Sequence, residues 1–262
     1  MTSAIPTSPP GPFTRRIVIV GGTSAIALEC AKLWLHEQPS ELLLIGRNLE
    51  RLHRAGNDLA IRFPRSRIDC LATKMCDPDE VENATKHACT AALPNIVLIA
   101  HGSLPSQATC EHDLTACRDA LDVNGVSPAL WAEAFAKAMK DGEPARLIVI
   151  GSVAGERGRQ SNYVYGAAKG LLARYVQGLQ HKMALSRSGL KVVLVKPGPT
   201  TTPMTAHLAA QGQRMASVEE VGRCIVGGVA KGMSVVYAPR RWRIIMMVIR
   251  HLPTMVFNRL KI

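Results

Sequence analysis

A tyrosine and a lysine four residues apart are the clearest chemical feature of this sequence. Tyr165 and Lys169 stand in the stretch VYGAAK, and Ser152 precedes them, directly after an apolar run. Side chains at positions i and i+4 of a helix project from the same face. An ammonium group beside a phenol favours the phenolate and lowers the pKa of the tyrosine. Such a tyrosine can transfer a proton to a carbonyl oxygen near neutral pH, although ordinary amphipathic helices with a surface lysine show the same spacing.

The elements that must position these residues follow from the alternation of apolar runs and helical patterns. Strands are predicted at residues 16–20, 42–45, 68–73, 96–100, 147–150, 191–195 and 234–237. Helices are predicted at residues 25–37, 49–62, 79–92, 115–140, 163–187 and 218–231. Short runs that are apolar on both faces are typical of buried parallel strands. The alternation therefore predicts an α/β fold with a doubly wound, parallel, seven-stranded sheet of the Rossmann type.

The chain shows no internal repeat and no linker, so we expect one domain. It covers residues 15–239, after a proline-rich, flexible arm at residues 1–14 and before a basic, apolar tail at residues 240–262. A length of 262 residues is sufficient for one large α/β core. The arm lacks a basic start followed by an apolar stretch, so we expect no signal peptide.

The charge balance predicts an anionic partner. The chain carries 32 Lys and Arg against 20 Asp and Glu, a net charge of +12, which suits phosphate, nucleic acid or a membrane surface. Nucleic acid is not expected, because no recognition motif is present and aromatic residues make up only 4%. The seven cysteines and eight histidines lack ligand spacing. We therefore expect reduced thiols, a cytoplasmic protein and no metal site.

The loop after the first strand predicts a nucleotide site. Its sequence, VGGTSAIA at residues 20–27, opens the first helix, where backbone N–H groups and the helix dipole favour a pyrophosphate. Gly21 allows the turn, and Thr23 and Ser24 offer N–H and hydroxyl donors. Ala25 and Ala27 stand where glycines are usual, but alanine adds only a methyl group.

The end of the second strand predicts which cofactor binds. The sequence LIGRN has no carboxylate to bind the 2′-hydroxyl of an adenosine ribose, and Arg47 stands where it can meet a 2′-phosphate. We therefore expect NADP(H) to be favoured over NAD(H). The alternative is that Arg47 is a solvated residue at the start of a helix.

With these residues assembled, the chain resembles the short-chain dehydrogenase/reductase family over about residues 16–237. The family's Asn-Asn-Ala-Gly stretch is similar to residues 99–102 (IAHG), and its helix asparagine matches Asn124 in DVN. Its serine, tyrosine and lysine match Ser152, Tyr165 and Lys169. The residues expected to contact the cofactor are Gly21, Thr23, Ser24, Ala25, Ile26, Arg47, Asn48, Asp77, Ala100, Gly102, Tyr165, Lys169, Pro197, Gly198, Thr200 and Thr202.

The resemblance implies a reductase in which hydride passes from the nicotinamide to a ketone carbon. Tyr165 would donate a proton to the carbonyl oxygen, and Ser152 would hydrogen-bond the developing oxyanion. Lys169 would lower the tyrosine pKa and hold the nicotinamide ribose, and Asn124 would hold a water that returns the proton through Lys169. Tyr163 lacks a lysine four residues on. The loop at residues 197–212 would cover the substrate, with Thr200, Thr202 and Met204 as candidate lid residues.

A narrower resemblance concerns the substrate. Residues 158–165 (GRQSNYVY) and 242–253 (WRIIMMVIRHLP) are similar to the decaprenylphosphoryl-2-keto-ribose reductase branch, which reduces a lipid-linked keto-pentose. Residues 240–262 contain six Arg and Lys and no Asp or Glu. Their apolar run is too short to span a bilayer but suits a helix in the headgroup region of an anionic membrane. The alternative is a contact between subunits.

These observations favour an NADPH-dependent reductase of a small-molecule or lipid-linked ketone, a homo-oligomer at the cytoplasmic face of a membrane. A soluble 3-oxoacyl or hydroxysteroid-type reductase is the second enzyme hypothesis. A nucleotide-binding scaffold without turnover is the third, and the set of Asn124, Ser152, Tyr165 and Lys169 argues against it.

Overall fold

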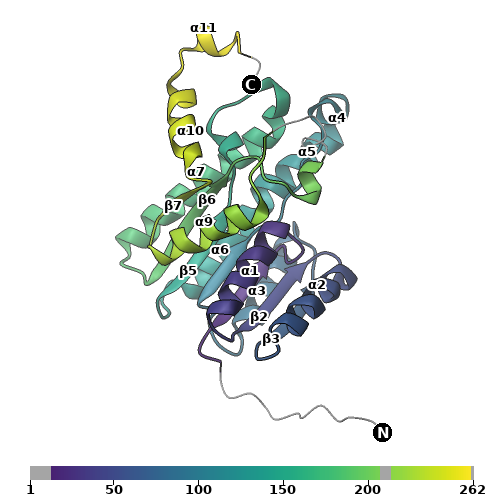
Figure 1. Cartoon of the computed structure of the whole chain (residues 1–262), viewed down its shortest axis with the longest axis vertical. Coiled ribbons are helices and arrows are strands. Elements are labelled where there is room, and N and C mark those ends of the chain that lie inside the picture. The colour runs from purple at the N-terminus through teal and green to yellow at the C-terminus, as the bar shows by residue number, and fades with distance from the viewer. Residues whose placement is uncertain (1–12, 207–213, 261–262) are drawn as a thin grey trace.

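The computed structural model describes residues 13–206 and 214–260, and its centre is one parallel sheet (Figure 1). The strands lie in the order β3-β2-β1-β4-β5-β6-β7. They are β1 Arg16–Val20, β2 Glu41–Gly46, β3 Arg67–Ala72, β4 Ile96–Ile99, β5 Ala145–Ile150, β6 Leu190–Pro197 and β7 Val235–Ala238. The seven predicted strands are confirmed within two residues at each end, and so is the doubly wound parallel architecture.

Helices cover both faces of the sheet. One face carries α1 Ala25–Glu37, α2 Leu49–Arg62 and α9 Val218–Ala230, and the other carries α3 Pro78–Cys89, α6 Ser127–Met139 and α7 Tyr163–Leu185. Figure 1 shows α1 and α9 crossing the near face. Because successive side chains of a strand point to opposite faces, Ile17 and Ile19 pack under α1, whereas Val18 and Val20 join the core under α6 and α7.

The predicted helix at residues 115–140 is interrupted. It consists of α5 Leu114–Leu121, a π-helical turn at Asp122–Val126, and α6. Pro128 lacks the N–H that an α-helix would donate to the carbonyl of Asn124, four residues earlier. The backbone widens instead, and the Ser127 N–H bonds to the Asp122 carbonyl. Such single π turns occur often at functional sites.

Several short elements were not predicted. They are α4 Gln107–His112, α11 Thr254–Phe257, and the 3₁₀ turns η2 Val153–Glu156, η3 Gln160–Asn162 and η4 Pro203–Thr205. The tail forms the helix that its apolar run suggested, α10 Arg241–His251. The predicted helix at residues 79–92 begins earlier, because Asp77 caps it and Pro78 opens it, and it ends at Cys89. In Figure 1, α10 and α11 extend beyond the end of β7 and away from the sheet. Among the described helices, none has the length and apolar character needed to cross a membrane.

Candidate active site

The first two turns of α7 carry the tyrosine and lysine. Tyr165 is partly buried, and Lys169 is buried. Ser152 follows β5 and caps η2, where its Oγ accepts a hydrogen bond from the Ala154 N–H at 3.1 Å. The Ser152 hydroxyl also interacts with the Tyr165 phenol. The structure therefore brings the predicted serine, tyrosine and lysine together at the carboxyl end of β5.

Lys169 is held by the backbone of the neighbouring strand. Its Nζ donates to the Ile150 carbonyl at 3.0 Å and lies 5.9 Å from the centre of the Tyr165 ring. Burial lowers the pKa of Lys169 to about 8, so the side chain is mainly protonated at pH 7. Two glycines let this part of α7 pack so closely: a Cβ on Gly155 would lie 2.6 Å from the Lys169 carbonyl carbon, and one on Gly125 would lie 2.9 Å from the Ala168 oxygen.

The pKa of Tyr165 has causes that differ from those expected from the sequence. Burial raises it, while the Ser152 hydroxyl and the charge of Arg159 lower it. The Lys169 ammonium donates to the Ile150 carbonyl at 3.0 Å. The expectation that Lys169 lowers the pKa of Tyr165 stays a prediction. The charge of Arg159, a residue that the sequence did not indicate, does lower this pKa.

Asn124 lies on the π turn and is fully buried. Its Oδ1 accepts from the Ser103 N–H and its Nδ2 donates to the Ala120 carbonyl, both at 2.9 Å. A Cβ on Gly102 would lie 2.8 Å from Asn124 Oδ1 and 3.9 Å from Lys169 Nζ. The side chains of Asn124 and Lys169 therefore both lie next to Gly102. A proton relay from Asn124 through the lysine requires such proximity.

The loop before α1 has the backbone that the sequence predicted. Gly21 has a φ of +91°, and a Cβ there would lie 2.6 Å from the His101 nitrogen. Its N–H donates to the Ile45 carbonyl at 2.8 Å, and Ser24 caps α1. Ala27 is fully buried in the core. The start of α1, with Thr23, Ala25 and Ile26, lies at the carboxyl edge of the sheet, where this fold binds nucleotides.

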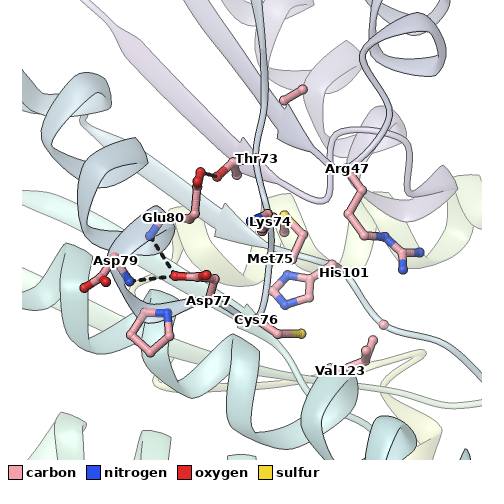
Figure 2. Close-up of a pocket in the computed structure, with 13 residues that line it drawn as sticks. Arg47, Thr73, Lys74, Met75, Cys76, Asp77, Asp79, Glu80, His101 and Val123 are labelled. Carbon is pink, nitrogen blue, oxygen red and sulfur yellow. Dashed lines mark hydrogen bonds between the residues drawn. The ribbon is translucent and has the colours of Figure 1, made fainter.

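A cavity of about 1040 Å³ lies beside this loop, at the carboxyl ends of β2, β3 and β4 (Figure 2). Arg47, Asp77, His101 and Gly102 are among its lining residues. Arg47 is exposed and forms no hydrogen bond or ion pair with any residue in the described ranges. Its guanidinium is therefore free to meet an anion in the cavity.

Asn48 and Asp77 also serve as helix caps. Asn48 Oδ1 accepts from the Arg51 N–H at 2.8 Å at the start of α2. Asp77 Oδ1 accepts from the Asp79 and Glu80 N–H groups at 3.1 and 3.2 Å, as Figure 2 shows. Asp77 lines the cavity and Asn48 follows the lining residue Arg47. Their predicted contacts with the cofactor stay predictions, and one side-chain oxygen of each already accepts backbone hydrogen bonds.

Sequence reasoning missed His101. Its Nε2 lies 2.9 Å from Ser127 Oγ, whereas its Nδ1 is buried without a partner among the residues described. Burial, followed by the charges of Lys169 and Arg47, lowers its pKa to about 3, so the ring is neutral at pH 7. Its place between Ala100 and Gly102, two predicted contact residues, was the signal that could have indicated it.

The turn after β6 is closed by its own hydrogen bonds. Thr200 is buried and its Oγ1 donates to the Gly198 carbonyl at 2.9 Å, while Thr202 Oγ1 lies 3.0 Å from Thr205 Oγ1. A Cβ on Gly198 would overlap the indole ring of Trp242, so the tail covers this glycine. Pro197 ends β6 and Met204 is exposed; residues 207–212 of the predicted lid lie outside the described ranges.

Comparison with known proteins agrees with this geometry. The family model described as short chain dehydrogenase matches residues 15–213. The chain belongs to the short-chain dehydrogenase family. An uncharacterised oxidoreductase of Streptomyces coelicolor is 28% identical over 249 residues, which are 94% of this chain and 96% of that protein. One from Staphylococcus aureus strain N315 is 25% identical over 215 residues, covering 82% and 90%.

Solved structures of short-chain dehydrogenases share the fold. The enzyme of Burkholderia cenocepacia J2315, in complex with NADP, matches with a TM-score of 0.79 at 19% identity, covering 94% of this chain and 97% of that one. The enzyme of Sphingobium yanoikuyae, in complex with NADPH, matches with a TM-score of 0.77 at 19% identity, covering 92% and 97%.

Family membership makes this chain an NAD(P)-dependent oxidoreductase. The residues at the site fit a dinucleotide. Gly21 leaves no room for a side chain, and the first helix begins at the same carboxyl edge of the sheet as the cavity. Both Arg47 and the Nδ1 of His101 lack partners within the described part of the chain. Backbone N–H groups at a helix start and an unpaired arginine are suited to phosphate groups.

Proposed function

We propose that this short-chain dehydrogenase uses NADPH to reduce a ketone on an apolar or lipid-linked molecule, of the keto-pentose type. The observation that carries the proposal is the cluster of Ser152, Tyr165 and Lys169 beside a nucleotide-sized cavity. When bound, the cofactor supplies hydride to the ketone carbon. The Tyr165 phenol donates the proton to the ketone oxygen, and Ser152 orients that oxygen by a hydrogen bond.

The buried lysine and the π turn complete the proton path. Lys169 is a cation whose ammonium donates to the Ile150 carbonyl and lies near Gly102, which Asn124 also contacts. Because Pro128 cannot donate to it in the α-helical manner, the Asn124 carbonyl can accept from a water instead. In the proposed mechanism this water supplies the proton that Tyr165 loses, through Lys169.

Arg47 supports a preference for NADPH. A guanidinium forms paired, charge-assisted hydrogen bonds to a phosphate, and Arg47 faces the cavity without a carboxylate partner in the described structure. The similar enzymes from Burkholderia and Sphingobium were solved with NADP and NADPH, respectively.

Replacing Arg47 should change the cofactor preference. We expect Arg47→Leu to reduce kcat/KM for NADPH by about ten- to a hundred-fold, because a hydrogen bond to a charged group is lost, and to leave kcat/KM for NADH nearly unchanged. Steady-state kinetics with both cofactors measure this. Arg51→Leu, an exposed arginine on the first turn of α2, is the matched control and should match the unmodified enzyme. An equal loss with both cofactors in Arg47→Leu would show that Arg47 does not distinguish them.

The tail, residues 240–262, packs on the segment that follows Ser152, which we call the catalytic loop. Glu156, whose side chain is 3% exposed, contacts Lys196 Nζ at 2.7 Å and Arg250 Nε at 3.5 Å. Arg157 donates to the carbonyls of Ile249 and Leu252, both at 2.6 Å, and stacks on the Phe257 ring. Since η2 contains Glu156 and begins immediately after Ser152, the tail packs on the short segment that follows the catalytic serine.

The outer side of the tail is apolar with cations around it. Its exposed apolar side chains are Ile244, Ile245, Met247, Val248, Met255, Val256 and Leu260. Its exposed arginines are Arg240, Arg241, Arg243, Arg250 and Arg259. This composition suits the headgroup region of an anionic membrane, so we propose that the tail rests there and places the site near a lipid-borne ketone.

A ketone panel tests the proposed function. NADPH oxidation is measured with a prenyl-phosphoryl keto-pentose, a 3-oxoacyl thioester and a 3-ketosteroid, each with and without anionic lipid vesicles. We expect the highest kcat/KM with the prenyl-linked ketone, increased by vesicles. Higher kcat/KM with the thioester or steroid would favour the second enzyme hypothesis, and no oxidation with any ketone would favour the scaffold.

A further inference from the structure

Arg159 occupies the loop that joins the catalytic serine to the catalytic tyrosine. It precedes η3 in extended backbone, and its carbonyl accepts from the Asn162 N–H at 3.2 Å. Its side chain is partly buried, and its positive charge acts on the Tyr165 phenol. Arg159 is therefore a cation on the short segment between the catalytic serine and the residue that we assign as proton donor.

Within the part of the chain that the structure describes, this cation has no counter-charge. Its side chain forms no hydrogen bond or ion pair with any residue in ranges 13–206 and 214–260. The carboxylates on the bordering elements are engaged elsewhere: Glu156 with Lys196 and Arg250, and Glu111 with Gln107 and the Tyr163 phenol. The segments outside the described ranges, residues 1–12, 207–213 and 261–262, contain no Asp or Glu.

A partly buried charge without a partner costs free energy, so it is usually paired or used to bind a ligand. Burial accordingly lowers the pKa of Arg159. Arg157 shows that an arginine of the same loop can find partners. Two residues earlier, Arg157 is fully engaged by the end of α10 and the Phe257 ring. One arginine holds the tail, and the other has no hydrogen-bond or ion-pair partner within residues 13–206 and 214–260.

We propose that Arg159 binds an oxyanion carried by the ketone substrate, a phosphate ester in the substrate class proposed above. The planar guanidinium can form two parallel hydrogen bonds to such a group. Because Arg159 belongs to the segment that joins Ser152 to Tyr165, we place the anion near the ketone that receives the proton. The inference rests on the proposed function for the identity of the ketone, but the anion site itself can be measured without turnover.

Equilibrium binding is the appropriate test, since loss of Arg159 also removes a charge that acts on Tyr165 and would slow the reduction of every ketone. Binding of farnesyl phosphate and of farnesol to the NADP⁺-loaded, full-length chain is measured by calorimetry. We expect Arg159→Met, which keeps the apolar stem, to weaken farnesyl phosphate binding by about ten- to a hundred-fold and to leave farnesol binding unchanged. Arg65→Met, an exposed arginine at the opposite edge of the sheet, should bind both ligands as the unmodified chain does.

The outcomes separate the anion site from the proposed reaction. Unchanged farnesyl phosphate affinity in Arg159→Met, or an equal loss for farnesol, would overturn the anion site whether or not any ketone is reduced. Displacement of farnesyl phosphate by an equal concentration of inorganic phosphate would overturn its assignment to a substrate-borne anion. A selective loss in Arg159→Met would support the site even if the ketone panel identified a different reaction.

Discussion

Replacing Tyr165 by phenylalanine should reduce ketone reduction by about a hundred- to ten-thousand-fold, the usual contribution of a positioned general acid. The substitution removes only the hydroxyl that would protonate the ketone oxygen, and the ring keeps its place on α7. Ser152 keeps its hydrogen bond from the Ala154 N–H, so the loop should hold its shape. We expect NADPH affinity within about threefold of that of the unmodified enzyme, since one neutral hydrogen bond contributes little net free energy. Steady-state kinetics and NADPH titration measure the two effects separately.

Tyr163 provides a matched control two residues earlier on the same helix. Its side chain is exposed and its phenol interacts with Glu111, away from Ser152 and Lys169. Tyr163→Phe should therefore retain nearly normal kcat. Near-normal kcat in Tyr165→Phe would mean that another group donates the proton, and a large loss in Tyr163→Phe alone would move the assignment to that residue.

The strands and the catalytic cluster could be predicted because their signals are local. A run such as RIVIV must be buried on both sides, and a four-residue spacing places Tyr165 and Lys169 on one face of any helix. The parallel order then brings Ser152, at the end of β5, to the same edge of the sheet. The π turn also had a local signal in Pro128, but the apolar pattern of the helix continues through it and conceals the break.

The electrostatics could not be predicted, because they depend on contacts between distant segments. The spacing predicts that Lys169 lowers the pKa of Tyr165, which stays a prediction, but it gives no sign that the buried ammonium donates to the Ile150 carbonyl on β5. The isolation of Arg159 becomes visible only when Glu156 is seen to be occupied by Lys196 and Arg250. Similarly, the sequence near Gly198 does not predict that Trp242 covers this glycine.

Charging the outer side of α10 should abolish membrane binding while the fold is retained. Ile244 and Val248 stand one turn apart and are 66% and 54% exposed, so glutamates there disturb no core. Each large apolar side chain contributes about 1.5–3 kcal/mol when it leaves water, and the new carboxylates would repel anionic lipid. We therefore expect the double variant Ile244→Glu, Val248→Glu to bind phosphatidylglycerol vesicles at least about a hundred-fold more weakly, measured by sedimentation. It should still oxidise NADPH with a water-soluble ketone, because Glu156, Arg157 and Arg250 keep the catalytic loop and the tail together.

Point substitutions test this surface better than removal of the tail. Truncation after Pro239 would take Arg250 from the buried Glu156 and uncover Gly198, so lost activity could not be separated from a damaged site. The double variant Ile61→Glu, Leu185→Glu, at residues 82% and 72% exposed on α2 and α7, controls for added charge and should bind vesicles far better. Vesicle binding by the unmodified chain should also weaken at high salt, because its arginines face anionic lipid. If that chain does not bind vesicles and the α10 variant instead changes the oligomer mass in solution, the outer side of α10 is a subunit contact, and a lipid-borne ketone loses its main structural support.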